Sequence, residues 1–356
     1  MNEKQCYFAS SNSMLGFQSY FDLIYDTNKL KRIYIIKGGP GTGKSSTIRA
    51  VGEHFKSEKC EYFLCSSDPS SLDGLIINGE FAIIDGTSPH AIEAKYPGAV
   101  ETLINNANGM KKGIQKRRNE IVLLNNEKSK LFKGAYAFLK ASGEIKKEYV
   151  KNISSGIDVG KLDAAISRYF KQNLKRGEGY AEHVRLIEGI TPQGRYNTHS
   201  FGAQSKRKTI IINGKGYEEI IYKRFIEKAK EYGINTHISF DPLIPFSPNG
   251  LLFSELSTCI VNYNESVHGN VDYDKYKVIN CERFLDKDTM SNMRSRIRFA
   301  GKCSQSLIDE AIHYFSEASK IHKELESIYY EYTDFGCVDE NTYNIINEIK
   351  DNLRHE

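Results

Sequence analysis

The sequence predicts an α/β protein made of two tandem domains, each with a parallel sheet and a helical extension. Three observations lead to this prediction. Short apolar runs typical of strands alternate with helical segments, which favours parallel sheets covered by helices. Segments of the first half recur in the second half in the same order. The chain has 356 residues, more than the ~250 to 300 at which a single core usually stops growing.

The composition is that of an ordinary globular protein, with 40% hydrophobic and 26% charged residues. Its 49 basic and 45 acidic residues are too balanced to identify nucleic acid or an anionic membrane as the partner. No apolar stretch approaches the ~20 residues of a membrane span, and the N-terminus lacks the apolar segment of a signal peptide. The seven cysteines include no CxxC pair, which favours reduced thiols over a zinc site or disulfides. We therefore expect a cytoplasmic protein with no membrane partner.

The repeat has a nearly constant spacing. Residues 34–38 match residues 210–214, and residues 73–76 match residues 249–252, in both cases 176 positions later. Five further matches fall 173 to 179 positions apart: 15–16 with 193–194, 68–69 with 241–242, 88–90 with 266–268, 134–139 with 310–315, and 171–174 with 350–353. Collinear matches of this kind predict an internal duplication. The boundary is expected near residue 181, giving domains 1–181 and 182–356.

Each half is expected to contain three core strands followed by helices. The strands lie at residues 32–36, 61–66 and 81–85 in the first half, and at 210–212, 236–240 and 258–262 in the second. The later segments, 111–153 and 287–332, have apolar residues at helical spacing, which predicts a helical hairpin or subdomain on each sheet. The stripe formed by Ile145, Tyr149 and Ile153 is interpreted as core packing.

Residues 38–45, here called the glycine loop, fit the pattern G-x-x-x-x-G-K-[ST] between a strand and a helix. Glycines let the backbone fold closely around a phosphate chain, so that several N–H groups and the helix dipole face its oxygens. Lys44 is expected to reach the β- and γ-phosphates, and the Ser45 hydroxyl to bind Mg²⁺. The predicted ligand is ATP with Mg²⁺, bound by Gly38, Gly39, Pro40, Gly41, Thr42, Gly43, Lys44, Ser45 and Ser46.

A carboxylate at the end of a neighbouring strand would complete the magnesium site. The apolar run at residues 81–84 ends in Asp85, so Asp85 and Ser45 are the predicted metal ligands. Two alternatives are a purely turn-forming role for Asp85 before Gly86, and Asp68 as the carboxylate instead.

The second copy has lost this apparatus. With Gly38 aligned to Gly214, Lys44 becomes Ile220 and Ser45 becomes Ile221, and at the third strand Asp85 becomes Asn262. We expect the second half to be a degenerate P-loop-like repeat without nucleotide. It would pack on the first half or supply an arginine to the γ-phosphate. The candidate arginines are Arg185, Arg195, Arg294, Arg296 and Arg298.

The chain resembles a family of bacterial P-loop ATPases built from two related halves. The resemblance rests on residues 37–45, on the signature D-G-T-x-P-H at residues 85–90, and on residues 95–100. It implies ATP binding, ATP hydrolysis and tandem P-loop NTPase-like domains. From the residues themselves, Thr87 could reach the γ-phosphate and His90 could orient water or transfer a proton. A structural histidine is the alternative, because the degenerate copy keeps His268.

The predicted function is a Mg-ATPase whose catalytic residues are Lys44, Asp85 and His90. Hydrolysis is expected to be slow or stimulated by an unidentified macromolecular partner, because Gly86 stands where many fast P-loop ATPases carry a glutamate. One alternative is a nucleoside or small-molecule kinase with a helical lid at residues 116–118. Another is a nucleotide-gated scaffold for nucleic acid, using lysines and arginines at 111–118 and 206–208. The absence of an N-K-x-D motif favours ATP over GTP.

Overall fold

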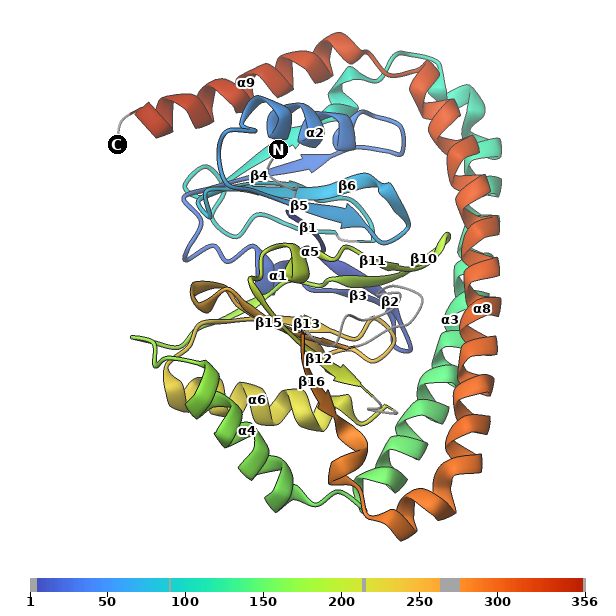
Figure 1. Ribbon diagram of the computed structural model, residues 1–356. Coiled ribbons are helices and arrows are strands. Elements are labelled where there is room, and N and C mark those ends of the chain that lie inside the picture. Colours follow the sequence, from blue (N-terminus) through green and yellow to red (C-terminus); the bar gives the residue numbers. More distant parts are fainter. Residues whose placement is uncertain (1–4, 90, 213–215, 263–275, 355–356) are drawn as a thin grey trace.

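Two six-stranded sheets, one from each half, form the centre of the molecule (Figure 1). The computed structural model describes residues 5–89, 91–212, 216–262 and 276–354. The first sheet has the order β1-β5-β6-β7-β4-β8, with bounds β1 Gln5–Phe8, β5 Cys60–Cys65, β6 Asp68–Ile77, β7 Phe81–Asp85, β4 Arg32–Lys37 and β8 Glu101–Asn105. The second has the order β9-β13-β14-β15-β12-β16, with bounds β9 Glu182–Val184, β13 Thr236–Phe240, β14 Pro248–Phe253, β15 Thr258–Asn262, β12 Arg207–Ile212 and β16 Lys277–Asn280. The α/β class is confirmed, and the matching strand order is consistent with a tandem duplication.

Both sheets are mixed, so the expectation of parallel sheets is wrong. β6 runs antiparallel to β5 and to β7, and β14 runs antiparallel to β13 and to β15, while the other pairs of neighbours are parallel. Two residues join β5 to β6, and so short a connection permits only an antiparallel return. The sequence analysis missed β6 because its first residues, Asp68-Pro69-Ser70-Ser71, are typical of a turn.

Helices cover the outer faces of both sheets, and small elements fill the space between them (Figure 1). α2 (Lys44–His54) and α9 (Phe335–Arg354) lie outside the first sheet, and α6 (Glu218–Tyr232) and α4 (Val159–Asn173) outside the second. Between the sheets lie the hairpins β2 (Ser10–Ser13) with β3 (Gly16–Ser19) and β10 (Glu188–Thr191) with β11 (Gly194–Asn197), together with α1 (Phe21–Ile24) and α5 (Ser200–Ala203). The described residues also form four 3-10 turns: η1 Asn106–Gly109, η2 Ile114–Arg117, η3 Ser254–Leu256 and η4 Cys281–Phe284.

The last helix of each half belongs to the core of the other half. Ile345 and Ile349 of α9 are buried in the core of the first sheet, and Tyr169 and Phe170 of α4 in the core of the second. The Thr342 hydroxyl of α9 also donates to the Thr47 hydroxyl of α2 at 3.1 Å. The predicted boundary near residue 181 falls between α4 and β9, but the two cores exchange helices across it.

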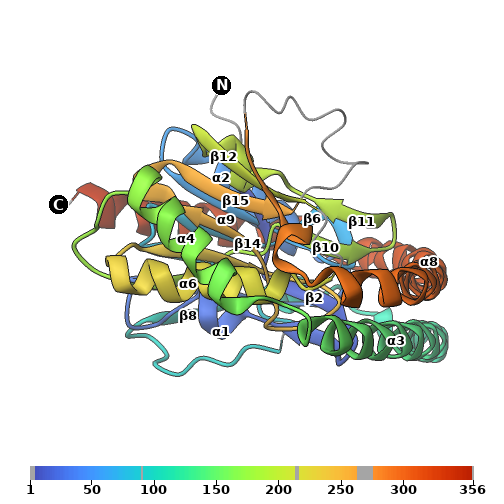
Figure 2. The same cartoon turned by 60° about the horizontal axis from the view of Figure 1, so that its bottom comes forward.

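The long helices α3 (Arg118–Ser154) and α8 (Lys287–Glu331) pair with each other instead of forming a hairpin on each sheet. They run side by side along one edge of the molecule in both views (Figures 1 and 2). The rings of Phe132 and Phe315 are 5.5 Å apart, and the hydroxyls of Ser142 and Ser304 are 2.7 Å apart. The apolar residues of the two helices bury one another together with Met14, Ile190 and Leu243 from outside the pair. Among the described residues, no helix is both long enough and apolar enough to cross a membrane.

Candidate functional site

The glycine loop connects the C-terminal end of β4, a central strand, to the N-terminus of α2. β4 is buried along its apolar residues, and this fixes the start of the loop. Gly41 and Gly43 have φ angles of +67° and +79°, values that non-glycine residues rarely adopt. The predicted strand, loop and helix therefore follow one another as the motif requires.

The backbone of the glycine loop presents hydrogen-bond donors without protein acceptors. Within residues 5–89, 91–212, 216–262 and 276–354, the N–H groups of Gly41, Thr42, Gly43 and Lys44 donate to no partner. Backbone N–H groups in folded proteins are nearly always paired with protein or water. A run of converging unpaired N–H groups at a helix N-terminus is suited to an anion.

Lys44 and Asp85 face each other at the carboxyl end of the parallel strands. The Lys44 ammonium lies 3.7 Å from Asp85 Oδ2, and both side chains are largely buried. Lys44 also donates to the carbonyls of Gly38 at 3.2 Å and Gly39 at 2.7 Å. Asp85 Oδ1 accepts from the backbone N–H of Thr87 at 2.9 Å and from its hydroxyl at 2.5 Å. Asp85 thus forms the turn considered as its alternative role and still directs its second oxygen at Lys44.

The predicted magnesium ligands are hard oxygen donors, which suit Mg²⁺. The Ser45 hydroxyl accepts from the Leu72 backbone N–H at 2.9 Å, which leaves its second lone pair for a metal. Asp68, the competing carboxylate, accepts from Ser70 and Ser71 and stabilises the turn that opens β6. In the described part of the chain, no cluster of three or more His, Cys, Asp or Glu side chains could hold a metal. Ser45 and Asp85 fit a magnesium ion held mainly by nucleotide phosphates and water.

The second half forms one wall of this site, which the sequence analysis did not foresee. A Cβ atom added to Gly39 would lie 2.7 Å from the ring of Tyr329, and one added to Gly41 would lie 2.5 Å from the Glu326 carbonyl oxygen. Both contacts come from the C-terminal end of α8. Val338 of α9 approaches Gly43 in the same way. Close contact with α8 and α9 is therefore a second reason, besides the positive φ angles, why glycines are needed in this loop.

Charged groups of α8 are close enough to the glycine loop to affect its electrostatics. Burial raises the pKa of Glu326, and the charge of Asp68 raises it further, while Lys44 opposes this shift. Burial lowers the pKa of His322 to about 4, with contributions from Lys128 and Lys44. His322 is therefore neutral at pH 7.

The corresponding region of the second half is filled by protein side chains. Tyr217 and Ile221 are fully buried, and a Cβ atom on Gly216 would lie 2.1 Å from the Tyr149 hydroxyl oxygen. Lys146 of α3 makes an ion pair of 2.6 Å with Asp241 beside it. Burial raises the pKa of Glu218, which begins α6 at the position where an intact loop would present N–H groups to phosphate. This arrangement agrees with the predicted loss of nucleotide binding there, which stays a prediction.

Among the remaining residues named from the sequence, the candidate arginines make their contacts away from the glycine loop. His90 and its counterpart His268 fall outside the described residues. Arg185 is buried in an ion pair with Glu61. Arg294, Arg296 and Arg298 lie near the N-terminal end of α8, roughly 42 to 48 Å along the helix from Glu326 at ~1.5 Å per residue. Arg195 contributes to the charges around Glu188 and Asp241 in the second half. None of these arginines contacts the glycine loop within the described ranges.

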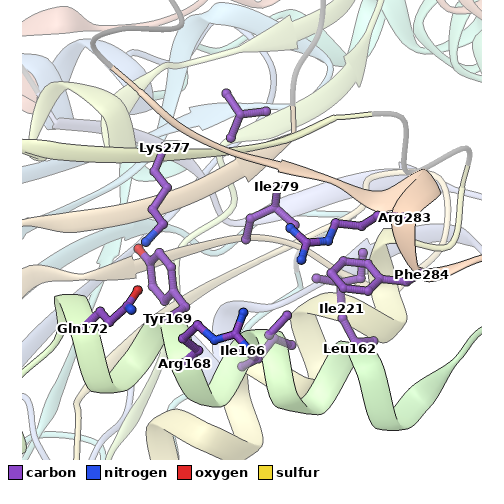
Figure 3. Close-up of a pocket in the computed structure, with 12 residues that line it drawn as sticks. Leu162, Ile166, Arg168, Tyr169, Gln172, Ile221, Lys277, Ile279, Arg283 and Phe284 are labelled. Carbon is purple, nitrogen blue, oxygen red and sulfur yellow. The ribbon is translucent and has the colours of Figure 1, made fainter.

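The basic lid expected at residues 116–118 is also engaged elsewhere. Arg117 makes a bidentate contact with Glu120 and lies 3.6 Å from Glu331 of α8. A small cavity of about 130 Å³ lies between α4 and β16 (Figure 3). Arg168, Lys277 and Arg283 line it, and the Lys277 ammonium is 4.8 Å from the Tyr169 ring centre. This volume is below the ~300 to 1,000 Å³ of typical ligand sites, so the cavity is too small for a nucleotide.

Comparisons with models of known families, with curated proteins and with solved structures gave no match. The resemblance to two-repeat P-loop ATPases therefore stays a prediction.

Proposed function

We propose that the protein is a Mg²⁺-dependent ATPase whose single nucleotide site is the glycine loop of the first half. The observation that carries the proposal is the run of backbone N–H groups at residues 41–44 that have no acceptor among the described residues. They surround the end of a helix whose first residue, Lys44, already faces a carboxylate. Phosphate oxygens would satisfy these donors and replace the loop carbonyls as acceptors for the Lys44 ammonium.

Each residue has a definite task in this reading. The loop N–H groups bind the phosphate chain, and Lys44 neutralises charge that develops between the β- and γ-phosphates. Ser45 and Asp85 would hold Mg²⁺, which polarises the phosphates when bound. The Thr87 hydroxyl donates to Asp85, so it orients this carboxylate rather than reaching the γ-phosphate in this conformation.

Slow turnover is part of the proposal. Gly86 follows Asp85 and carries no side chain to position water, and the Gly86 N–H is bound to the Ile36 carbonyl at 2.9 Å. The contacts of α8 with Gly39 and Gly41 also limit access to the loop. Stimulation by a macromolecular partner is part of the same proposal.

The test is steady-state release of ADP and phosphate from ATP with Mg²⁺, comparing the wild type with Lys44→Ala and Asp85→Asn. Both variants should lose at least about 100-fold in turnover, because each removes charge stabilisation at the reacting phosphate. Lys223→Ala is the matched control, since Lys223 is the exposed partner of Glu219 at the corresponding helix of the second half. Equal turnover in all four proteins would refute the proposal.

The same assay separates hydrolysis from phosphotransfer. A panel of nucleosides is added as acceptors, and ADP formation is compared with free phosphate release. ADP that forms only with an acceptor would make the protein a kinase.

A further inference from the structure

Near the glycine loop, the second half carries two titratable residues that the proposed function has not used. Glu326 and His322 lie one helical turn apart near the C-terminal end of α8. The backbone of Glu326 contacts Gly41, and the charge of Lys44 acts on both side chains. Lys44 is the residue that would reach the γ-phosphate, so both groups are within electrostatic range of the predicted site, and the backbone of Glu326 adjoins the loop.

The two halves provide an internal comparison. α3 and α8 align with a spacing of 176 residues, which superposes the buried Ala135 and Ala311 and the buried Leu139 and Phe315. The turns after the helices agree with this register, since the Lys111 N–H donates to the Tyr332 carbonyl and the Asp286 N–H to the Gly156 carbonyl.

In this register Glu326 corresponds to Val150, which packs on the core of the second sheet. The residue whose backbone contacts the intact glycine loop is therefore acidic, whereas its counterpart in the second half is apolar and packs on the core. A packing role alone would favour an apolar residue at both positions. A carboxylate occurs at this helix position only in the half whose glycine loop is predicted to bind phosphate. This difference points to a chemical role for Glu326.

His322 lies beside Glu326 on the same helix. Lys128 Nζ lies 3.4 Å from His322 Nδ1, and a protonated lysine can only donate, so the ring proton is on Nε2. His322 Nε2 lies 3.6 Å from Glu326 Oε1. The chain Lys128, His322 and Glu326 links α3 to α8 and ends at the glycine loop.

We propose that Glu326 is the catalytic base of the ATPase, supplied to the first half's site by the second half. It would take the role for which Gly86 has no side chain. This inference rests on the proposed function.

The reaction step balances without any further reactant. The water oxygen forms a bond to the γ-phosphorus while the bond from the γ-phosphorus to the bridging oxygen breaks, and the electron pair leaves with ADP. Glu326 accepts the proton of the attacking water and then releases it to solvent.

The test compares Glu326→Gln with Glu324→Gln, a variant of an exposed residue on the same helix. Single-turnover hydrolysis is measured with protein in excess over ATP, and ATP binding by equilibrium dialysis with Mg²⁺. Glu326→Gln should slow hydrolysis by about 100-fold or more, the usual contribution of a general base. Binding of ATP should stay equal or become tighter, because the substitution removes a negative charge that faces the phosphates. Glu324→Gln should match the wild type in both measurements.

Two results would overturn the inference while leaving the proposed function in place. One is hydrolysis by Glu326→Gln within about threefold of the wild type. The other is weaker ATP binding in proportion to slower hydrolysis, which indicates a structural role at the interface. A wild type that neither binds nor hydrolyses ATP would instead refute the proposed function, and the inference with it. Thermal melting followed by circular dichroism establishes that each variant is folded.

Discussion

Replacement of Arg185 by alanine tests whether this arginine joins the two halves or acts on the nucleotide. Arg185 contacts both carboxylate oxygens of Glu61, at 3.3 Å and 2.8 Å, and both side chains are about nine-tenths buried. Burial by itself would raise the pKa of Glu61, but the Arg185 charge and hydrogen bonds outweigh it and hold that pKa below its usual range. Without Arg185 a buried carboxylate would stay unpaired. The free energy of unfolding should fall by about 3 to 5 kcal/mol at pH 7.5.

The pH dependence gives this prediction its sharpest form. In the wild type the pair stabilises the fold above the unfolded pKa of Glu61, near ~4.3, and this stability is lost as pH falls through the folded pKa. In Arg185→Ala uncompensated burial raises the Glu61 pKa, so the carboxylate is protonated at a higher pH. The difference from the wild type should therefore be largest near neutral pH and shrink toward about pH 4.

Urea unfolding at several pH values measures the effect, with Arg224→Ala as the control. Arg224 forms exposed ion pairs with Asp163 and Glu227, and its loss should cost less than about 1 kcal/mol. A loss below about 1 kcal/mol for Arg185→Ala, or one that does not vary with pH, would refute the reasoning. Glu61 lies four residues before the end of β5, roughly 13 Å of strand from the edge that carries the glycine loop. Hydrolysis per folded molecule should therefore be unchanged, and a large loss of turnover in a stable variant would make Arg185 the arginine finger instead.

Two further substitutions test the contacts of α8. Gly41→Ala should destabilise the protein by more than about 2 kcal/mol in thermal denaturation. The added methyl group collides with the Glu326 carbonyl, and a positive φ costs a further ~1 to 2 kcal/mol. The control is Gly79→Ala, at φ +75° with open space around it, which should show only the cost of the positive φ. Phe315→Ala should cost about 3 to 5 kcal/mol in urea unfolding, because its ring is buried between α3 and α8. Phe299→Ala on the same helix, where the ring is 71% exposed, should change stability by less than about 0.5 kcal/mol, and equal effects of the two would contradict the helix pairing.

The apolar runs predicted the central strands well because local burial dictates them. The strands expected at 32–36, 61–66 and 81–85 agree within one residue with β4, β5 and β7. β8 at one edge of the first sheet was missed because only Leu103 and Ile104 of its residues are apolar. β1 at the other edge was missed because it has only four residues. The direction of β6 is set by the two-residue connection from β5. Hydrophobic periodicity in the sequence does not show the geometry of such a connection.

The site was predictable only where its residues are contiguous in the sequence. Lys44, Ser45 and the glycines form one motif, and Asp85 ends an apolar strand, so local patterns identify them. Glu326 and Tyr329 lie in a long helix whose periodicity indicates a buried face but not which partner it meets. The internal repeat was the one signal that could have located them, through comparison of 145–153 with the helix segment 176 residues later.

The exchange of terminal helices determines when during synthesis the first half can be completed. The hydroxyls of Thr47 and Thr342, which meet between α2 and α9, are 295 residues apart in the chain. At ~5 to 20 residues per second a ribosome needs roughly 15 to 60 s to add that length. During this interval α2, which follows the glycine loop, is not yet covered by α9. The glycine loop also lacks the wall that α8 forms. A nascent or truncated chain therefore carries the complete nucleotide-binding motif before it has the surroundings in which that motif could act.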